Sequence, residues 1–130
     1  MNISEVADKS GIAAKTIRYY ESIGLGPAPR RAENGYREYS PDDLETLRFI
    51  HRARDLGFSI RDVGDLLDLW RDRNRASAEV KALTERHIAE IEQRIAHLQS
   101  MRRTLRELAE KCHGDDRPDC PILDGLSTES

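Results

Sequence analysis

The two cysteines of this 130-residue chain, Cys112 and Cys120, lie close together in the C-terminal segment "KCHGDDRPDC". Thiolates are soft ligands that prefer ions such as Cu(I), Ag(I), Au(I), Zn(II) or Hg(II). A structural zinc site usually takes four ligands from two Cys-x-x-Cys or Cys/His clusters, and the chain contains no Cys-x-x-Cys. Two thiolates eight positions apart suit a monovalent ion that accepts two-coordinate, near-linear geometry.

Other polar residues of this segment leave alternatives open. His113 could complete a four-ligand zinc site with both cysteines and one aspartate, or it could point to solvent. A disulfide between the cysteines would need an oxidising signal, because the N-terminal sequence lacks a secretory layout and cytoplasmic thiols stay reduced. Three aspartates are expected to cap turns of the loop: Asp115, Asp116 and Asp119.

The composition limits the class of protein. Hydrophobic residues make up 38% and charged residues 35% of the chain, which suits a soluble cytoplasmic protein with a modest core, and no apolar run is long enough for a membrane span. No nucleophile–base pair, phosphate loop or cofactor fingerprint is present, so we do not expect an enzyme. The net charge of −3 hides a gradient: residues 15–37 carry five basic and two acidic side chains, whereas residues 76–130 carry 8 basic and 11 acidic ones. A basic N-terminal patch is compatible with DNA binding.

Two short amphipathic helices open the chain. The first is expected to start near Ser4, as its N-cap, and to end at Gly11, which adopts the left-handed conformation readily. The second, in "AAKTIRYYESIGL", turns Ile17 and Tyr20 to one side and four polar or aromatic residues to the other: Lys15, Thr16, Arg18 and Tyr19. Two such helices joined at a glycine indicate a helix-turn-helix whose second helix reads DNA.

The next segment, "RRAENGYREY", indicates a β-hairpin. Asn34-Gly35 is the strongest short hairpin signal, and a type I′ turn would need positive φ at both residues. The hairpin carries four side chains that suit phosphate oxygens: Arg30, Arg31, Tyr36 and Arg37. It therefore predicts a DNA-binding wing; the alternative is a solvated hairpin that packs Tyr36 and Tyr39 on the domain.

Three helices follow in the sequence. One runs from the N-cap Ser40 to Gly57, and another starts at Ser59 with core positions up to Trp70; both open with Ser-x-x-Asp. After the charged linker 71–76, residues 77–111 form a helical pattern without Gly or Pro and with a near-heptad apolar seam: Ile88, Ile91, Ile95, Leu98, Met101, Leu105, Leu108 and Cys112. A helix of roughly 50 Å exceeds what the small domain can cover, so a second copy is the simplest partner, in parallel or antiparallel orientation.

In this order, "KTIRYYESIGL", "ENGYREYS", "RARDLGFS", the long helix and the cysteine loop resemble MerR-type transcription regulators, and "CHGDDRPDCPIL" resembles their copper-responsive, CueR- and HmrR-like branch. The resemblance implies a mainly α fold: a winged helix-turn-helix domain at 1–70, a linker at 71–76, an antiparallel dimerisation helix at 77–111 and a metal-binding loop and tail at 112–130. It also implies a cytoplasmic homodimer that binds double-stranded promoter DNA and acts on RNA polymerase holoenzyme.

The resemblance assigns DNA contacts to two groups of residues. The recognition-helix group is Lys15, Thr16, Arg18 and Tyr19; the wing group is Arg31, Asn34, Tyr36 and Arg37, with Arg54 as a further phosphate contact. Many relatives have Ser or Thr just before the recognition helix, where this chain has Ala13 and Ala14. The missing hydroxyl cap is expected to weaken binding by about 1 kcal/mol.

Metal selectivity follows from a comparison within the family. Zinc-, lead- and mercury-responsive relatives place a cysteine at the start of the long helix, whereas this chain has Ser77, as copper-type members do. The resemblance therefore implies one Cu(I), Ag(I) or Au(I) ion per Cys112–Cys120 pair and activation of copper efflux or detoxification genes by promoter distortion. The alternatives are a regulator of the same fold that responds to zinc, cadmium, mercury or thiol oxidation, and a cytosolic metal carrier.

Overall fold

The structure, a computed structural model, describes residues 1–115, 118 and 120–127. It divides into two compact units, Met1–Leu83, which we call the head, and Thr84–Ser130, which we call the arm. The described residues form six helices and one isolated β-bridge, which confirms the mainly α fold. None of these helices combines the length and the hydropathy that crossing a bilayer requires.

The head begins with the helix pair expected from the sequence. Helix α1 spans Ile3–Ser10, and its last turn ends at Gly11, whose φ of 78° is left-handed as expected. The predicted N-cap Ser4 is wrong: Asn2 takes the extended cap conformation, and its side chain accepts a hydrogen bond of 2.8 Å from the Glu5 backbone N–H. The helix thus starts earlier, because the amide side chain of Asn2 satisfies a free N–H of the first turn. Helix α2 spans Ala14–Ser22.

The wing, residues 30–39, is a minimal hairpin joined by one antiparallel bridge between Arg31 and Arg37. Its turn differs from the predicted type I′ form, because Gly35 has a positive φ of 84° whereas no residue other than glycine does in the described chain. Backbone bonds run from Gly35 N–H to the Ala32 carbonyl and from Ala32 N–H to the Tyr36 carbonyl, each 2.9 Å. A three-residue loop that ends in a left-handed glycine needs a single positive φ, so Asn34 avoids strain.

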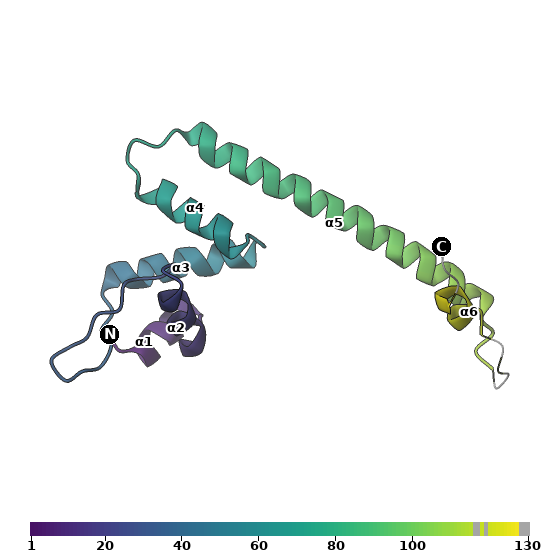
Figure 1. Ribbon diagram of the computed structural model, residues 1–130, viewed down its shortest axis with the longest axis horizontal. Helices are drawn as coiled ribbons and strands as arrows, with labels where there is room; N and C mark the ends of the chain where they lie inside the picture. Colours follow the sequence, from purple (N-terminus) through teal and green to yellow (C-terminus); the bar gives the residue numbers. More distant parts are fainter. Residues whose placement is uncertain (116–117, 119, 128–130) are drawn as a thin grey trace. The chain divides into compact units, whose positions relative to one another are not determined.

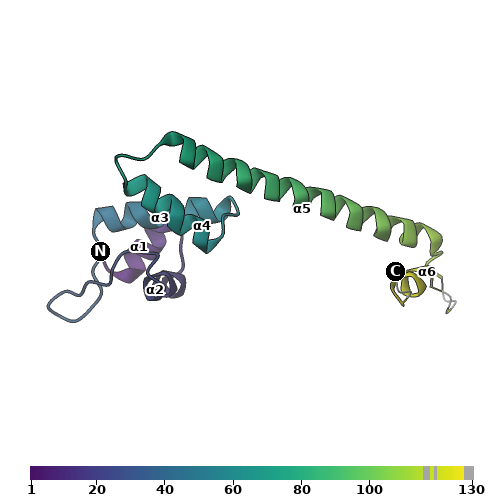
Figure 2. The same cartoon turned by 45° about the horizontal axis from the view of Figure 1, so that its top comes forward.

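Helices α3 (Pro41–Asp55) and α4 (Ile60–Arg71) begin at the serines that the sequence indicates. Ser40 and Asp43 form a reciprocal capping box, and the Ser59 hydroxyl accepts from the Asp62 backbone N–H at 3.1 Å. Helix α3 packs against both α1 and α4, and α1 also packs against α2 (Figures 1 and 2). This arrangement leaves one side of α2 free of the core.

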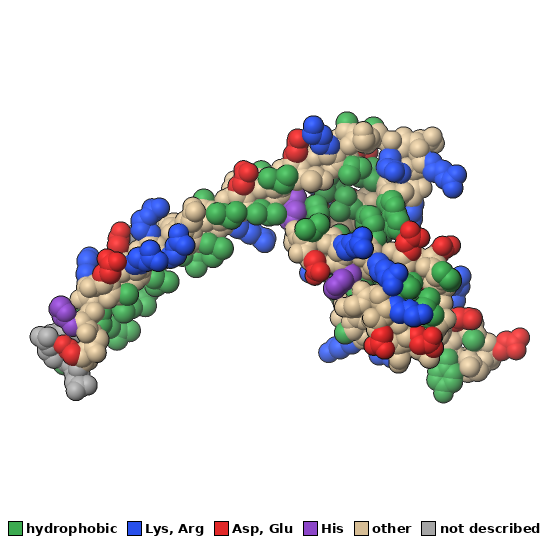
Figure 3. All heavy atoms as spheres, turned by 180° about the vertical axis from the view of Figure 1, so that it is seen from behind, with side chains coloured by type: hydrophobic (Ala, Val, Ile, Leu, Met, Phe, Trp, Pro, Cys, Tyr) green, Lys and Arg blue, Asp and Glu red, His purple; other side chains and the backbone are tan. Residues whose placement is uncertain are grey.

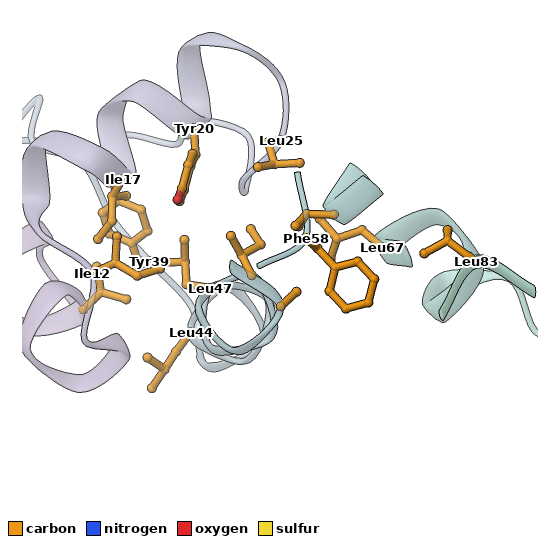
Figure 4. Packing of buried hydrophobic residues seen from close by; sticks show 14 residues of the cluster. Ile12, Ile17, Tyr20, Leu25, Tyr39, Leu44, Leu47, Phe58, Leu67 and Leu83 are labelled. Atoms are coloured by element: carbon orange, nitrogen blue, oxygen red, sulfur yellow. The ribbon is translucent and has the colours of Figure 1, made fainter. Parts of the chain in front are cut away.

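One hydrophobic cluster holds the head together (Figure 4). Its fully buried members come from α1, α2, α3 and α4, and its largest side chains are Ile17, Leu47, Ile50, Val6 and Val63. Trp70, expected in the core, is instead 36% exposed and stacks on Phe49 with ring centroids 4.5 Å apart. The two rings line a hollow of about 500 Å³ between α3 and α4 that holds none of the residues predicted to contact DNA or metal.

Helix α5 spans Ser77–Lys111, the range expected from the sequence. Its first turns belong to the head, where Leu83 is buried in the core. In the arm, apolar side chains form a continuous exposed row along α5 (Figure 3), and the large ones are between 37% and 60% exposed: Ile88, Ile91, Ile95, Leu98, Met101 and Leu105. The loop after α5 leads to helix α6 (Pro121–Ser127), where the sequence suggested only a loop and tail.

Candidate DNA interface and metal loop

The recognition helix α2 separates packing residues from residues available to a ligand. Ile17 is fully buried and Tyr20 is 7% exposed, which anchors this side of α2 in the core. On the other side Tyr19 is 50% exposed, Lys15 and Arg18 are exposed, and Thr16 is half-buried. The helix therefore presents together the four side chains that the sequence predicts for reading DNA.

The start of α2 lacks the side-chain cap that many helices have. Ala13 is the N-cap residue, and no side chain accepts a hydrogen bond there. The preceding turn is stabilised instead by buried Ser10, whose hydroxyl accepts from the Ile12 N–H at 3.2 Å and donates to the Ala7 carbonyl at 3.3 Å. Sequence reasoning missed this role of Ser10, although a serine before a helix-ending glycine is a common turn residue.

Several polar side chains of the wing form hydrogen bonds or ion pairs with other groups of the head. Arg31 donates to the Gly35 carbonyl at 2.9 Å, and the Asn34 side chain accepts from the Tyr36 N–H at 3.1 Å. Arg30 forms an ion pair with Asp43 in the first turn of α3, which explains its position at the base of the wing. Tyr36 is 73% exposed. The alternative prediction, a solvated hairpin that packs Tyr36 on the domain, is therefore wrong for this residue.

A cleft of about 420 Å³ lies between α2, the wing and the N-terminal residues. Three arginines and no carboxylate line it, so its potential favours an anion. It gathers five residues of the predicted interface with two further residues from the start of the chain: Arg18, Arg31, Asn34, Tyr36, Arg37, Asn2 and Ile3. A backbone phosphate of DNA matches the charge and the donors of this cleft.

The predicted phosphate contact Arg54 lies outside that cleft. Its guanidinium donates to the Phe58 carbonyl at 2.6 Å, directly after the end of α3. Arginine carries five N–H donors, so this bond leaves others available. A role of Arg54 at DNA stays a prediction.

The two cysteines flank the loop between α5 and α6. Cys112 follows the last residue of α5, Cys120 precedes the first residue of α6, and both are half-buried free thiols. Helix α6 lies close against the end of α5: a Cβ placed on Gly125 would meet the Leu108 side chain at 2.5 Å. The position of Cys120 is thus linked to a close helix–helix contact.

The other residues of the loop contribute less than the sequence suggested. His113 is exposed. Leu123 and Leu126 of α6 are 65% and 67% exposed in the single chain. Asp115 is described, whereas Asp116 and Asp119, two of the expected turn caps, lie outside the described residues.

The two cysteine thiols are the soft donors of this loop. In the described part of the chain, which leaves out two loop aspartates, no three Cys, His, Asp or Glu side chains converge as a metal site. Ser77 begins the 35-residue helix α5 and Cys112 follows its end, so the two residues lie at opposite ends of α5.

A helix pair with an exposed second helix, a wing and an arginine-lined cleft, followed by a long helix, define a winged helix-turn-helix DNA-binding protein. Comparison with known families agrees: residues 1–70 match the model described as MerR HTH family regulatory protein, and residues 44–108 match the model described as MerR, DNA binding. The chain belongs to the MerR family of transcriptional regulators.

Individual relatives span nearly the whole chain. It is 55% identical over 130 residues to heavy metal-dependent transcription regulator 2 of Rhizobium meliloti, and the aligned region covers all of this chain and 88% of that protein. It is 50% identical over 127 residues to the regulator CueR of Salmonella typhimurium, which covers 98% and 92% of the two chains. Among solved structures, the lead(II) complex of PbrR691 from Ralstonia metallidurans CH34 is similar with a TM-score of 0.84 and 33% identity, covering 98% and 99%.

Proposed function

We propose that this chain is a transcriptional activator that senses Cu(I), Ag(I) or Au(I), with one ion per Cys112–Cys120 pair, and controls genes of copper efflux and detoxification. The observation that carries the proposal is the pair of free, half-buried thiols at the two ends of one short loop. Relatives named for heavy-metal dependence, and others named HmrR and CueR, are 50–55% identical along almost the whole chain.

Charge and ligand number favour a monovalent ion. Two thiolates and Cu(I) leave a net charge of −1, whereas a divalent ion would give a neutral pair and would demand further ligands. His113 is the nearest additional donor in sequence, but it is exposed and belongs to no converging group among the described residues. At the start of the long helix this chain has the hydroxyl of Ser77, whereas a cysteine there would offer the metal ion a third thiolate and so favour a higher coordination number.

The exposed apolar row of α5 supports a homodimer. A stripe of this length is rarely left in water, and a second copy offers the same stripe in return. In an antiparallel pair centred near Ser100, Ile88 lies opposite Cys112 and Ile95 lies opposite Leu105. The same register carries Ser77 to the level of the cysteine loop and α6 of the second copy.

The mechanism follows as a shift between two states of the dimer. Cys112 and Cys120 would hold the ion between α5 and α6, and its binding would favour a state of the dimer with a different geometry between the two heads. The dimer binds double-stranded promoter DNA in both states, and its activated state bends and untwists the spacer so that RNA polymerase holoenzyme engages both promoter elements.

The test is a metal titration of the reduced full-length protein with Cu(I) and Zn(II). We expect one Cu(I) per cysteine pair, retained against a strong thiol competitor, and loss of this binding in Cys112→Ser and Cys120→Ser. His113→Asn is the matched control and should bind Cu(I) like the parent. Preferential uptake of zinc that His113→Asn abolishes would overturn the monovalent assignment and support the divalent alternative.

Transcription assays distinguish the other classes. Promoter switching by peroxide under copper chelation would identify a thiol redox regulator in place of a metal sensor. A cytosolic metal carrier would keep its activity when Arg18 is changed to alanine, because it has no use for a DNA-binding head. The proposed regulator should lose promoter activation in the Arg18 variant while it still binds Cu(I).

A further inference from the structure

Glu21, at the end of α2, is a buried carboxylate that none of the predicted DNA contacts includes. Its side chain is 3% exposed. One oxygen accepts a 2.9 Å bond from Nε of Arg37, and the other accepts a bond from the Tyr39 hydroxyl. A buried charge is costly unless it is paired and hydrogen-bonded, so the bonds from Arg37 and Tyr39 together offset the cost of burying Glu21.

The second partner, Tyr39, connects Glu21 to the start of the chain. Tyr39 is 4% exposed; its N–H donates to the Met1 carbonyl at 2.8 Å, and the Met1 ammonium group donates to the Tyr39 carbonyl at 2.9 Å. Burial, followed by the hydrogen bond and charge of Glu21, raises the pKa of the Tyr39 hydroxyl, so it stays a donor. The end of the wing is therefore held between α2 and the N-terminal residues.

The wing needs such an anchor, because it is joined internally by a single bridge between Arg31 and Arg37. An isolated two-stranded hairpin is marginally stable in water. The bond between Glu21 and Arg37 joins residues of α2 and the wing that are 16 positions apart, so it relates the recognition helix directly to the wing.

The same bond determines how the guanidinium of Arg37 is oriented. Arginine has five N–H donors, and the bond to Glu21 uses the one on Nε. Arg37 also lines the anion-binding cleft beside Arg18 and Arg31. With Nε held by Glu21, the terminal nitrogens of Arg37 are the donors left for an anion in this cleft.

We propose that Glu21 is a positioning residue for DNA binding, because it orients Arg37 toward a backbone phosphate in the cleft and sets the wing relative to α2. The proposal rests on the DNA binding of the proposed function. The proposal predicts that removal of the Glu21 charge weakens DNA binding, whereas simple electrostatics predicts that it strengthens binding. A carboxylate close to the phosphates should repel them, yet removal of its charge weakens binding, because a misoriented Arg37 loses its phosphate contact.

The experiment measures affinity of the full-length protein for a mixed-sequence duplex of roughly two helical turns, since phosphate contacts do not depend on sequence. We expect Glu21→Gln to bind about tenfold more weakly, the size of one lost charge-assisted hydrogen bond, and to reduce the salt slope by about one per head. The matched control is Glu33→Gln, which removes an exposed carboxylate of the wing and should bind equally or more tightly with an unchanged slope.

A double-mutant cycle separates positioning from a general structural role. Arg37→Lys keeps the charge, but its single ammonium group cannot bind Glu21 and a phosphate at once as the planar guanidinium can. This variant should lose about as much affinity as Glu21→Gln. The double variant should lose little more than either single variant. Tyr39→Phe keeps the ion pair of Glu21 with Arg37, so it should lose thermal stability but retain affinity within about twofold.

Three results would overturn the proposal: tighter binding by Glu21→Gln, additive losses in the double variant, or a loss in Tyr39→Phe equal to that in Glu21→Gln. If Glu21→Gln does not fold, Arg37→Lys decides, and parent-like affinity and salt slope in that variant would refute the positioning role. Failure of the parent protein to bind the duplex would refute the DNA-binding function instead.

Discussion

Gly125 in α6 offers a direct test of whether helix packing influences the proposed metal loop. A Cβ at this position would meet Leu108 Cδ2 at 2.5 Å and Cδ1 at 3.1 Å, whereas carbon atoms pack best at about 3.5–4.0 Å. Gly125→Ala therefore requires α6 or the Leu108 side chain to move by about 1 Å. Overpacking of this kind costs about 1–3 kcal/mol, and the better helix propensity of alanine offsets about 1 kcal/mol of it.

The movement reaches the proposed metal site, because α6 begins at the residue after Cys120. If about 1.4 kcal/mol of the strain appears in the bound state, Cu(I) affinity falls roughly tenfold. The assay is competition with a chromophoric Cu(I) chelator, and circular dichroism checks that helix content is kept. Leu108→Val shortens the side chain so that it has no δ carbon to meet the new Cβ, and the double variant should recover most of the affinity. Unchanged affinity in Gly125→Ala, or no recovery in the double variant, would refute this reasoning.

Three further predictions concern the other parts of the chain. Ala13→Ser supplies the missing N-cap of α2 and should raise the free energy of unfolding by about 1 kcal/mol; a urea melt measures it, and an unchanged midpoint contradicts it. The pKa of Tyr39 is raised above its unfolded value of 10.0, so its contribution is complete below pH 10 and is lost as pH rises above it; melts of the parent and Tyr39→Phe should converge at high pH, and a constant difference would exclude this linkage. Ile95→Asp puts a charge on the exposed row of α5 and should dissociate the dimer in sedimentation, whereas a dimer that persists would exclude this seam.

Local signals in the sequence predicted most helix boundaries correctly. The Ser40–Asp43 capping box, the Ser59 cap and the left-handed Gly11 all involve groups within a few residues of each other. Such bonds form whenever the local backbone does, so their residue pattern is sufficient. The bounds of α5 follow for the same reason, because nothing between Ser77 and Lys111 interrupts its hydrogen bonds.

Errors arose where two local solutions compete. Both Asn2 and Ser4 can cap α1, and the pairing of Met1 with Tyr39, far along the chain, places the N-terminal residues so that Asn2 is the cap. Asn34-Gly35 permits more than one hairpin turn, and the structure adopts the one with a single positive φ. Helix α6 was missed because it is short and its contact with Leu108 in α5 is not visible in its own residue pattern.

The sequence alone determined helices α1 to α5, the exposed side of α2, the family and the identity of the two thiols, because these depend on residue type and short spacing. Tertiary structure decided which polar groups share an environment. In the folded chain Arg37 donates to Glu21 and lines the arginine-lined cleft, whereas Arg54 lies outside that cleft. Gly125 of α6 lies close to Leu108 of α5. These contacts join residues distant in sequence, and their energies depend on burial and orientation that only the packed chain provides.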